Sequence, residues 1–260
     1  MALYDSIGRS YDTTRKADPG ITRRLARHLN LRPGAPYLDV ACGTGNYTVA
    51  LQNLGAQMHG IELATTMLDK AQPKSDRVRW IQGNAQSLPF RERSFAGATC
   101  TLAIHHMKDT RRVFAELFRV IDSGRFVIFT ADHPQMDGYW LKEYFPNAIA
   151  AAIKQMPSAN GVVHHLRLAG FNNVETEPWE VPRDLQDWFL YAGKHRPEIY
   201  LDPAVRAGTS FFAQGLATAE ETAAGCQQLA DDIKSGRIEK VAKKYRHNLG
   251  DYLFVIATKA

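Results

Sequence analysis

Segments with strand and helix character alternate along the first half of the chain, and this rhythm constrains the fold more than any other feature. Short apolar runs that end at turn residues predict strands at 36–41, 56–63, 77–83, 95–104 and 124–131. Segments with helical spacing of apolar residues predict helices at 21–30, 46–54, 64–72 and 110–121. Because strands that alternate with helices of this length form βαβ crossovers, the pattern predicts a parallel sheet with helices on both faces.

The rhythm breaks after residue 131 and resumes near the end of the chain. Segments 132–157 and 183–248 carry helical pieces and concentrations of aromatic residues. A helix at 158–171 and strands at 172–182 and 251–259 continue the sheet, which brings the strands to seven. We therefore expect an α/β fold, a Rossmann-like doubly wound and mostly parallel seven-stranded sheet with helical cap insertions, in a single domain spanning residues 1–260.

Charge and cysteine content narrow the class of protein. The 32 Lys and Arg residues exceed the 27 Asp and Glu residues by five, but they form short clusters on scattered helix faces, so nucleic-acid binding is not favoured. No stretch approaches 18 uncharged apolar residues, so no membrane span is expected. Three separated cysteines are typical of reduced thiols, and no spacing of His, Cys and carboxylates predicts a metal site. With an N-terminus that has no apolar signal segment, these features predict a cytoplasmic protein.

The richest motif is Leu38-Asp39-Val40-Ala41-Cys42-Gly43-Thr44-Gly45-Asn46, in which a predicted strand meets a helix through a glycine-rich turn. Such a turn places backbone N–H groups and a helix N-terminus over a bound ligand. A dinucleotide fingerprint would have Gly or Ala where Thr48 stands. The Asp39 carboxylate at the strand end would oppose a pyrophosphate, but it suits a ligand with an ammonium group. Since S-adenosylmethionine carries an ammonium group and a sulfonium, the motif favours this ligand over NAD.

Two later strand ends match the same ligand. Glu62 ends the second predicted strand, where a carboxylate can accept both hydroxyls of a ribose. Asn84-Ala85 follows the third, where the side-chain carbonyl can accept from the adenine amino group and a backbone N–H can donate to the ring. Each residue alone is a weak signal, because acids also cap helices and Asn is common in turns. Three matching strand ends in order make a specific signal for an adenosyl ligand.

The sequence resembles the class I S-adenosylmethionine-dependent methyltransferases, in particular the small-molecule group that includes the ubiquinone-biosynthesis C-methyltransferases. The resemblance rests on LDVACGTGNYT (38–48), GIELATTML (60–68), GNAQSLPF (83–90), FAGATCTLAIHHMKD (95–109) and FAELFRVIDSGRFVIFT (114–130). It covers residues 4–131 well, and GFNNVE (170–175) with the last strand more weakly. It implies an enzyme that uses S-adenosylmethionine as its cofactor.

The resemblance also implies where the cofactor binds. The implied cofactor-binding residues are Tyr11, Asp39, Ala41, Gly43, Gly45, Glu62, Leu63, Met67, Asn84, Ala85, Thr101 and Leu102. Asp39 and the glycine turn would hold the methionine part, and Glu62 would take the ribose. Leu63 and Met67 would flank the adenine, whereas Thr101 or Leu102 would offer its backbone to the amino-acid end. Tyr11 belongs to an N-terminal segment, residues 1–32, that would close over the cofactor as a lid.

Two positions and one turn depart from the family pattern. The turn before the fifth predicted strand, IDSGR (121–125), is one residue shorter than usual. Ala41 stands where the first glycine of the turn is usual, which is a mild change. Asn84 stands where an aspartate is usual, so we expect weaker selection of adenine rather than its loss.

Methyl transfer from a sulfonium is an in-line displacement, and holding the partners aligned in a dry site supplies much of the catalysis. Only an acceptor that must lose a proton needs a base. The candidates are His105, His106 and His133, which follow the fourth and fifth predicted strands. A structural role that orients the turn is the alternative for the His105–His106 pair.

The two insertions, 132–157 and 183–248, would cap the substrate. Their aromatic residues predict a hydrophobic acceptor pocket with a mobile lid, or a private core that packs the insertions on the sheet, and both can hold. We expect a small-molecule acceptor, apolar or aromatic. The alternatives are an RNA or protein methyltransferase, which would show an open basic cleft, and a regulatory protein that binds S-adenosylmethionine without transferring a methyl group.

Overall fold

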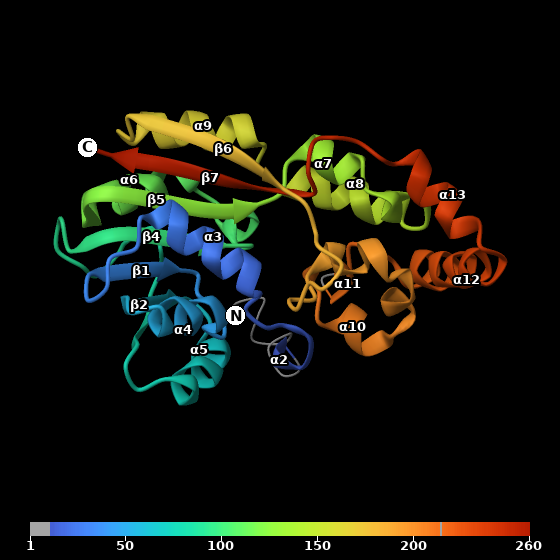
Figure 1. Ribbon diagram of the computed structural model, residues 1–260, viewed down its shortest axis with the longest axis horizontal. Coiled ribbons are helices and arrows are strands. Elements are labelled where there is room, and N and C mark those ends of the chain that lie inside the picture. The colour runs from blue at the N-terminus through green and yellow to red at the C-terminus, as the bar shows by residue number, and fades with distance from the viewer. Residues whose placement is uncertain (1–10, 214) are drawn as a thin grey trace.

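The computed structural model describes residues 11–213 and 215–260, and its centre is one seven-stranded sheet (Figure 1). The strands are β1 (Pro36–Val40), β2 (Gln57–Glu62), β3 (Arg79–Gln82), β4 (Phe95–Thr101), β5 (Ile121–Thr130), β6 (Asn173–Trp179) and β7 (Tyr252–Lys259). Their order is β3-β2-β1-β4-β5-β7-β6. Strands β1 to β5 pair in parallel, and β7 runs antiparallel to both of its neighbours. The predicted α/β class and the mostly parallel seven-stranded sheet are confirmed.

Helices cover both faces of this sheet. The helices around it are α2 (Tyr11–Thr14), α3 (Pro19–Leu29), α4 (Asn46–Asn53), α5 (Thr65–Ala71), α6 (Thr110–Val120) and α9 (Ala159–Leu168), with short 3-10 turns η2 (Gln72–Lys74) and η3 (Ile104–His106). On one face, Leu25 of α3 packs with Tyr37 and Val127 of the sheet. On the other, Phe114 of α6 packs with Leu38 of β1 and with Leu166 of α9. The alternation of strands and helices expected from the sequence therefore produces a three-layer sandwich.

Aspartate caps fix where two of these helices begin. The Asp18 carboxylate accepts from the backbone N–H groups of Gly20 and Ile21 at 2.8 and 3.1 Å, just before Pro19 opens α3. The Asp109 carboxylate accepts from the N–H of Arg112 at 3.1 Å at the start of α6. These caps satisfy N–H groups that a helix terminus leaves without intrahelical partners.

Strand β5 is longer than the sequence indicated. The expected strand began at residue 124, after a turn, but β5 begins at Ile121 directly after the last residue of α6. The pairing with β4 shifts register between Phe95 and Gly97, which absorbs the extra residues. At Gly124 a Cβ atom would lie 2.0 Å from the Ala96 carbonyl oxygen, so the close approach of the two strands requires glycine here.

The two expected insertions lie together beyond the carboxyl ends of the parallel strands (Figure 1). Their elements are α7 (His133–Asp137), η4 (Trp140–Glu143), α8 (Pro146–Gln155), η5 (Leu190–His195), η6 (Pro197–Leu201), α10 (Pro203–Ala207), α11 (Ser210–Ala213), α12 (Ala219–Ser235) and α13 (Arg237–Lys244). They share one apolar core with α3 and its face of the sheet. The division into a lid and caps stays a prediction, and residues 1–10 of the expected lid lie outside the described residues.

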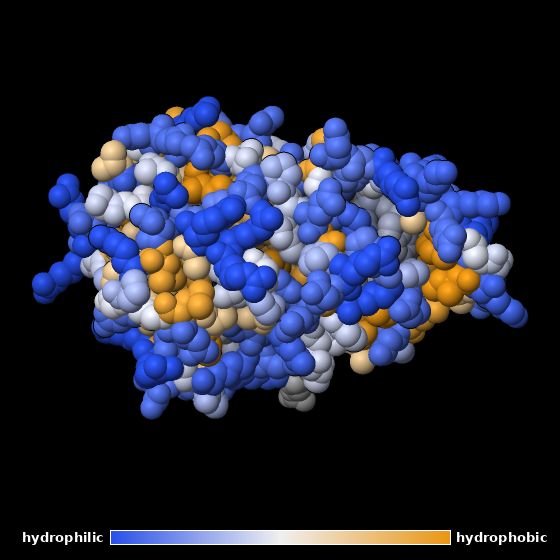
Figure 2. All heavy atoms as spheres, in the orientation of Figure 1, coloured by the Kyte–Doolittle hydropathy of each residue, from blue (hydrophilic) through white to orange (hydrophobic). Residues whose placement is uncertain are grey.

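The surface is mostly hydrophilic on the face that Figure 2 shows, and hydrophobic side chains gather there in small separate patches. Within the part of the chain that the structure describes, no helix has both the length and the apolar character needed to cross a bilayer. No group of three or more His, Cys, Asp and Glu side chains in that part is arranged to hold a metal ion.

Candidate active site

The turn between β1 and α4 has the backbone conformation that its sequence predicts. Gly43 and Gly45 have φ of +56° and +76°, a region in which residues with a Cβ atom are strained. At Gly45 a Cβ atom would also lie 2.3 Å from the Trp80 ring, so no larger residue fits. Ala41 adopts φ of +55° despite its side chain. This residue is the one that stands in place of the family's first glycine, and it keeps the glycine conformation.

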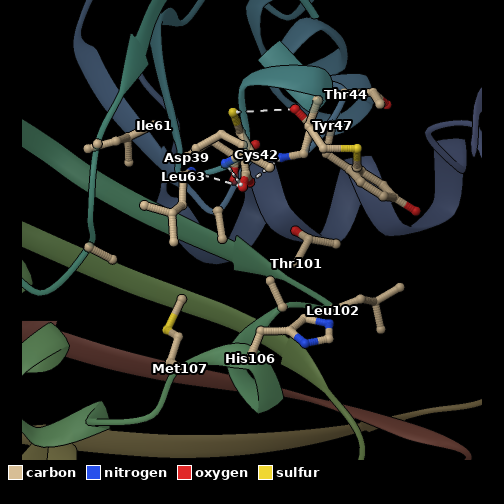
Figure 3. A pocket seen from close by; sticks show the side chains of 18 of the residues that line it. Asp39, Cys42, Thr44, Tyr47, Ile61, Leu63, Thr101, Leu102, His106 and Met107 are labelled. Atoms are coloured by element: carbon tan, nitrogen blue, oxygen red, sulfur yellow. Dashed lines mark hydrogen bonds between the residues drawn. The ribbon is translucent and has the colours of Figure 1, made fainter. Parts of the chain in front are cut away.

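A cavity of about 540 Å³ opens at the carboxyl ends of β1, β2 and β4, beside this turn. In Figure 3, Asp39, Cys42 and Leu63 lie on one side of it, and His106 and Met107 lie opposite. The expected cofactor-binding residues that line it are Tyr11, Asp39, Ala41, Gly43, Glu62, Leu63, Met67, Asn84, Ala85, Thr101 and Leu102. Gly45 does not line it; this residue lies against the Trp80 ring instead. The structure thus brings these residues together around one space, while their individual roles remain predictions.

Asp39 is buried at the end of β1, with 2% of its surface exposed. Its two carboxylate oxygens accept hydrogen bonds from the hydroxyls of Thr48 at 2.6 Å and Thr99 at 2.9 Å. Burial raises the pKa of Asp39 to about 6, and the two hydroxyls oppose that rise. Thr48, which separated this motif from a dinucleotide fingerprint in the sequence, therefore has a definite task in fixing the Asp39 carboxylate.

Glu62 is fixed by backbone donors at the end of β2. One carboxylate oxygen accepts from the N–H of Gly43 at 3.0 Å, and the other accepts from the N–H groups of Leu63 and Ala64 at 2.9 and 3.0 Å. These bonds connect the glycine turn to the second strand and hold the carboxylate at the cavity wall. Asn84 is also engaged, because its side-chain oxygen accepts from the N–H of Gln86 at 2.9 Å.

The wall of the cavity includes a buried ion pair between the N-terminal segment and the second insertion, which the sequence did not predict. The guanidinium of Arg15 contacts the Asp187 carboxylate at 2.5 and 3.2 Å, and the Tyr47 hydroxyl donates to the same carboxylate at 3.0 Å. The Arg15 and Asp187 side chains are 11% and 1% exposed, and both line the cavity. The residues lie 172 positions apart in the chain, so no local pattern signals the pair.

Further hydrogen bonds and a second ion pair join the N-terminal segment to its neighbours around the cavity. The Asp12 carboxylate accepts from the Thr44 hydroxyl at 2.6 Å and pairs with the Lys74 ammonium group at 2.8 Å. The backbone N–H of Trp188 donates to the Thr14 carbonyl at 3.1 Å. The described part of the N-terminal segment is therefore bonded both to the glycine turn and to the second insertion.

A second cavity, of about 100 Å³, adjoins the first. Tyr11, Arg15 and Leu102 line both cavities. The residues that line only the smaller one come largely from the insertions and β7, and include Met136, Met156, Phe189, Tyr191, Phe211 and Tyr252. Leu102 has φ of +54°, an uncommon conformation for a residue with a branched side chain, and its N–H donates to the Phe129 carbonyl at 2.8 Å.

The three histidine candidates lie in different places. His106 lines the larger cavity and His105 lines the smaller one, with their rings 3.9 Å apart. Burial lowers the pKa of His106 to about 4, and burial together with His106 lowers the pKa of His105 to about 3. His133, in contrast, lines neither cavity, and its Nε2 lies 2.7 Å from the Met156 carbonyl oxygen. The position expected for His133, facing the site, does not match the structure, because its ring is turned towards the end of α8.

Comparison with known proteins finds similarity to methyltransferases. A family model described as a methyltransferase domain matches residues 38–129. The demethylmenaquinone methyltransferase of Clavibacter sepedonicus is 26% identical over 205 residues, which cover 74% of this chain and 80% of that protein. Matches to further demethylmenaquinone methyltransferases cover between 51% and 76% of those proteins.

Among solved structures, a protein of Anabaena variabilis described as a methyltransferase from an antibiotic biosynthesis pathway superposes with a TM-score of 0.85. It is 32% identical, and the match covers 95% of this chain and 99% of that one. Phosphoethanolamine N-methyltransferase 2 of Haemonchus contortus, solved with S-adenosylmethionine, shares the fold at a TM-score of 0.61 and 19% identity, over 100% of this chain and 60% of that one.

Proposed function

Because the chain belongs to the class I S-adenosylmethionine-dependent methyltransferases, we propose that it holds this cofactor in the larger cavity and a small apolar or aromatic acceptor in the smaller one. The observation that carries the proposal is the junction between the two spaces. Tyr11, Arg15 and Leu102 line both cavities, so ligands in the two would meet there. An arrangement of two adjoining sites is what a direct transfer between two bound molecules requires.

The residues of the larger cavity fit the cofactor. Its volume of about 540 Å³ is in the range of small-molecule sites. The Thr101 hydroxyl in its wall is buried and has no hydrogen-bond partner among the described residues, which suits a wall that meets a polar ligand. Asp39 and Gly43 would hold the methionine part, Glu62 the ribose, and Leu63 and Met67 the adenine. When bound, S-adenosylmethionine supplies an electrophilic methyl group on a sulfonium, open to in-line displacement.

The chain itself supplies an apolar enclosure for the acceptor. Phe189, Phe211 and Tyr252 line the smaller cavity and are each no more than 5% exposed. Walls of this kind exclude water and hold the acceptor in a fixed orientation, which contributes to the rate without any proton transfer. An aromatic acceptor would also gain contact with these rings. The small size and apolar walls of this space favour a small molecule over RNA or a protein.

Of the candidate bases, His105 lines the cavity proposed for the acceptor, and His106 lines the cofactor cavity beside it. At pKa values of about 3 and 4, both rings are neutral near pH 7. A base with so low a pKa gives little driving force for proton abstraction. We therefore assign most of the catalysis to alignment and water exclusion, with the His105–His106 pair as an assisting base only for hydroxyl or thiol acceptors.

Isothermal titration calorimetry tests the cofactor site. S-adenosylmethionine and S-adenosylhomocysteine should bind, and NAD should not. Glu62→Gln should weaken binding at least tenfold, because the carboxylate meets the cavity wall, whereas Glu92→Gln, at an exposed position, should have no effect. Binding of NAD, or equal affinities in both variants, would show that the site is misassigned. Transfer of labelled methyl groups to a panel of phenols and quinols then tests the acceptor class.

A further inference from the structure

Two side chains on the wall of the smaller cavity bury polar atoms that have no hydrogen-bond partner among the described residues. They are the Tyr191 hydroxyl and the Nδ1 atom of His105. A buried polar group without a partner costs free energy, so such groups are few in folded proteins and need an explanation. Two of them on one small cavity point to a ligand that completes their hydrogen bonds.

Tyr191 is held rigidly in place. Its ring stacks on the Tyr139 ring at 3.8 Å and 20°, and meets the Tyr252 ring edge-on at 4.9 Å. The residue is 0% exposed. The neighbouring hydroxyls of Tyr139 and Tyr200 are paired with each other at 2.8 Å. In this stack, therefore, packing fixes the Tyr191 ring, yet its hydroxyl takes no part in the hydrogen bonds of its neighbours.

The hydroxyl of Tyr191 can act as a donor at neutral pH. Burial, followed by the neighbouring hydroxyls of Tyr252 and Tyr200, raises the pKa of Tyr191 well above its ordinary value. The phenol thus stays protonated and can give its proton to an oxygen acceptor.

The size of the cavity limits the ligand. A dry apolar cavity of about 150 Å³ is large enough to hold benzene. The smaller cavity measures about 100 Å³ and adjoins the larger one, so the part of the acceptor that lies within it is no larger than about a single six-membered ring. Its mixture of aromatic walls and two unpaired polar atoms suits a ring that carries an oxygen substituent.

We propose that the smaller cavity binds a single-ring aromatic acceptor through a hydrogen bond from the Tyr191 hydroxyl to an oxygen on that ring. The inference rests on the proposed function, which makes this cavity the acceptor site. It adds a specificity-determining residue from the second insertion and a limit on acceptor size, both absent from the cofactor motifs.

The test measures binding of phenol, toluene and 1-naphthol to the protein saturated with S-adenosylhomocysteine, by calorimetry or NMR titration. The wild-type protein should bind phenol more tightly than toluene, and 1-naphthol at least tenfold more weakly than phenol despite its larger apolar surface. Tyr191→Phe should weaken phenol binding about tenfold, as expected for a lost buried hydrogen bond, and leave toluene binding unchanged. Failure of the wild type to bind phenol, retention of the phenol preference in Tyr191→Phe, or tight binding of 1-naphthol would overturn the proposal.

The thermal stability of the unliganded variants gives a second readout. Tyr191→Phe should unfold at the wild-type temperature or higher, because it removes a polar atom that has no partner in the free protein. Tyr144→Phe is the matched control, since that buried hydroxyl donates to Asp232 at 2.9 Å and lines neither cavity. It should unfold at a lower temperature and bind phenol normally. A comparable loss of stability in both variants would show that the Tyr191 hydroxyl is structural.

The same samples separate the two proposals. Failure of the wild type to bind S-adenosylhomocysteine would refute the proposed cofactor site. Normal S-adenosylhomocysteine binding without a Tyr191-dependent preference for phenol would refute the acceptor inference alone.

Discussion

The buried ion pair between Arg15 and Asp187 should couple the N-terminal segment to the second insertion, and breaking it measures that coupling. The two side chains are 11% and 1% exposed, and two N–O contacts join them at 2.5 and 3.2 Å. Removing one member of such a pair leaves an uncompensated buried charge, which costs about 3–5 kcal/mol. We therefore expect Asp187→Ala to lower the free energy of unfolding by about this amount.

The double variant gives the decisive comparison. Arg15→Met combined with Asp187→Leu replaces both charges with apolar groups of similar volume, a change that is often close to neutral for buried pairs. Its loss of stability should therefore be well below the sum of the two single losses, although Tyr47 also loses its acceptor. Urea unfolding of the wild type, the single variants Arg15→Met and Asp187→Leu, and the double variant gives the coupling energy directly. Lys142→Ala is the control, because its exposed pair with Asp137 should contribute no more than about 1 kcal/mol.

Measuring cofactor affinity tests whether the Arg15–Asp187 pair also supports the proposed binding site. Arg15 and Asp187 line the larger cavity, and Arg15 also lines the smaller one. Asp187→Ala should therefore weaken S-adenosylhomocysteine binding in calorimetry as well as stability. Additive single effects, or wild-type affinity in the Asp187 variant, would refute the view that the two segments close the site as one unit.

Three further predictions concern the cofactor turn and the histidine pair. Asp39 is ionised above its pKa of about 6, so S-adenosylhomocysteine affinity should fall by roughly tenfold between pH 7 and pH 5. Asp39→Asn should remove this pH dependence. A wild-type affinity that does not change with pH would contradict a role of the Asp39 carboxylate in binding the ligand. Ala41→Gly should raise the free energy of unfolding by about 0.5–1 kcal/mol, because φ of +55° strains a residue with a Cβ; a less stable variant in urea would disprove this. His105 and His106 have pKa values of about 3 and 4 in the folded protein, below the value of about 6.5 for an unperturbed histidine. As the pH falls below about 6.5, the unfolded state therefore binds protons that the folded state does not. Each histidine should lower the free energy of unfolding by about 2 kcal/mol at pH 5 relative to pH 7. Replacing both by Asn should flatten the unfolding curve against pH, and an unchanged slope would contradict the burial effect.

The fold was largely predictable because its signals are local. Strand runs, helical spacing and the glycine turn each lie within a dozen residues, and together they predict a mostly parallel seven-stranded sheet. The start of β5 was missed because residues 121–123 read as a turn, whereas pairing with a shifted β4 draws them into the strand. Local preference was overridden there by tertiary pairing.

The candidate site was predictable only in part, and the reason is again sequence distance. Asp39 and Glu62 lie at the carboxyl ends of β1 and β2, and Asn84 follows β3, so the topology of a parallel sheet brings them to one edge. The Arg15–Asp187 pair joins segments 172 positions apart, and no periodicity connects them. The low pKa values of the two histidines depend on burial, which a motif does not report.

Acceptor specificity is hard to read from this sequence for a deeper reason. The turn between β1 and α4 is defined largely by its backbone conformation, and glycines at positive φ leave a recognisable pattern. The proposed acceptor cavity is lined by side chains that also form the core: Phe189 lines the cavity, yet its ring centroid lies 6.3 and 4.8 Å from those of Trp179 and Tyr252. Because the same aromatic residue meets both demands, its presence alone does not distinguish core from binding site. For the proposed acceptor cavity, the additional signal is the Tyr191 hydroxyl, which lies buried without a partner among the described residues at a position where packing alone would favour phenylalanine.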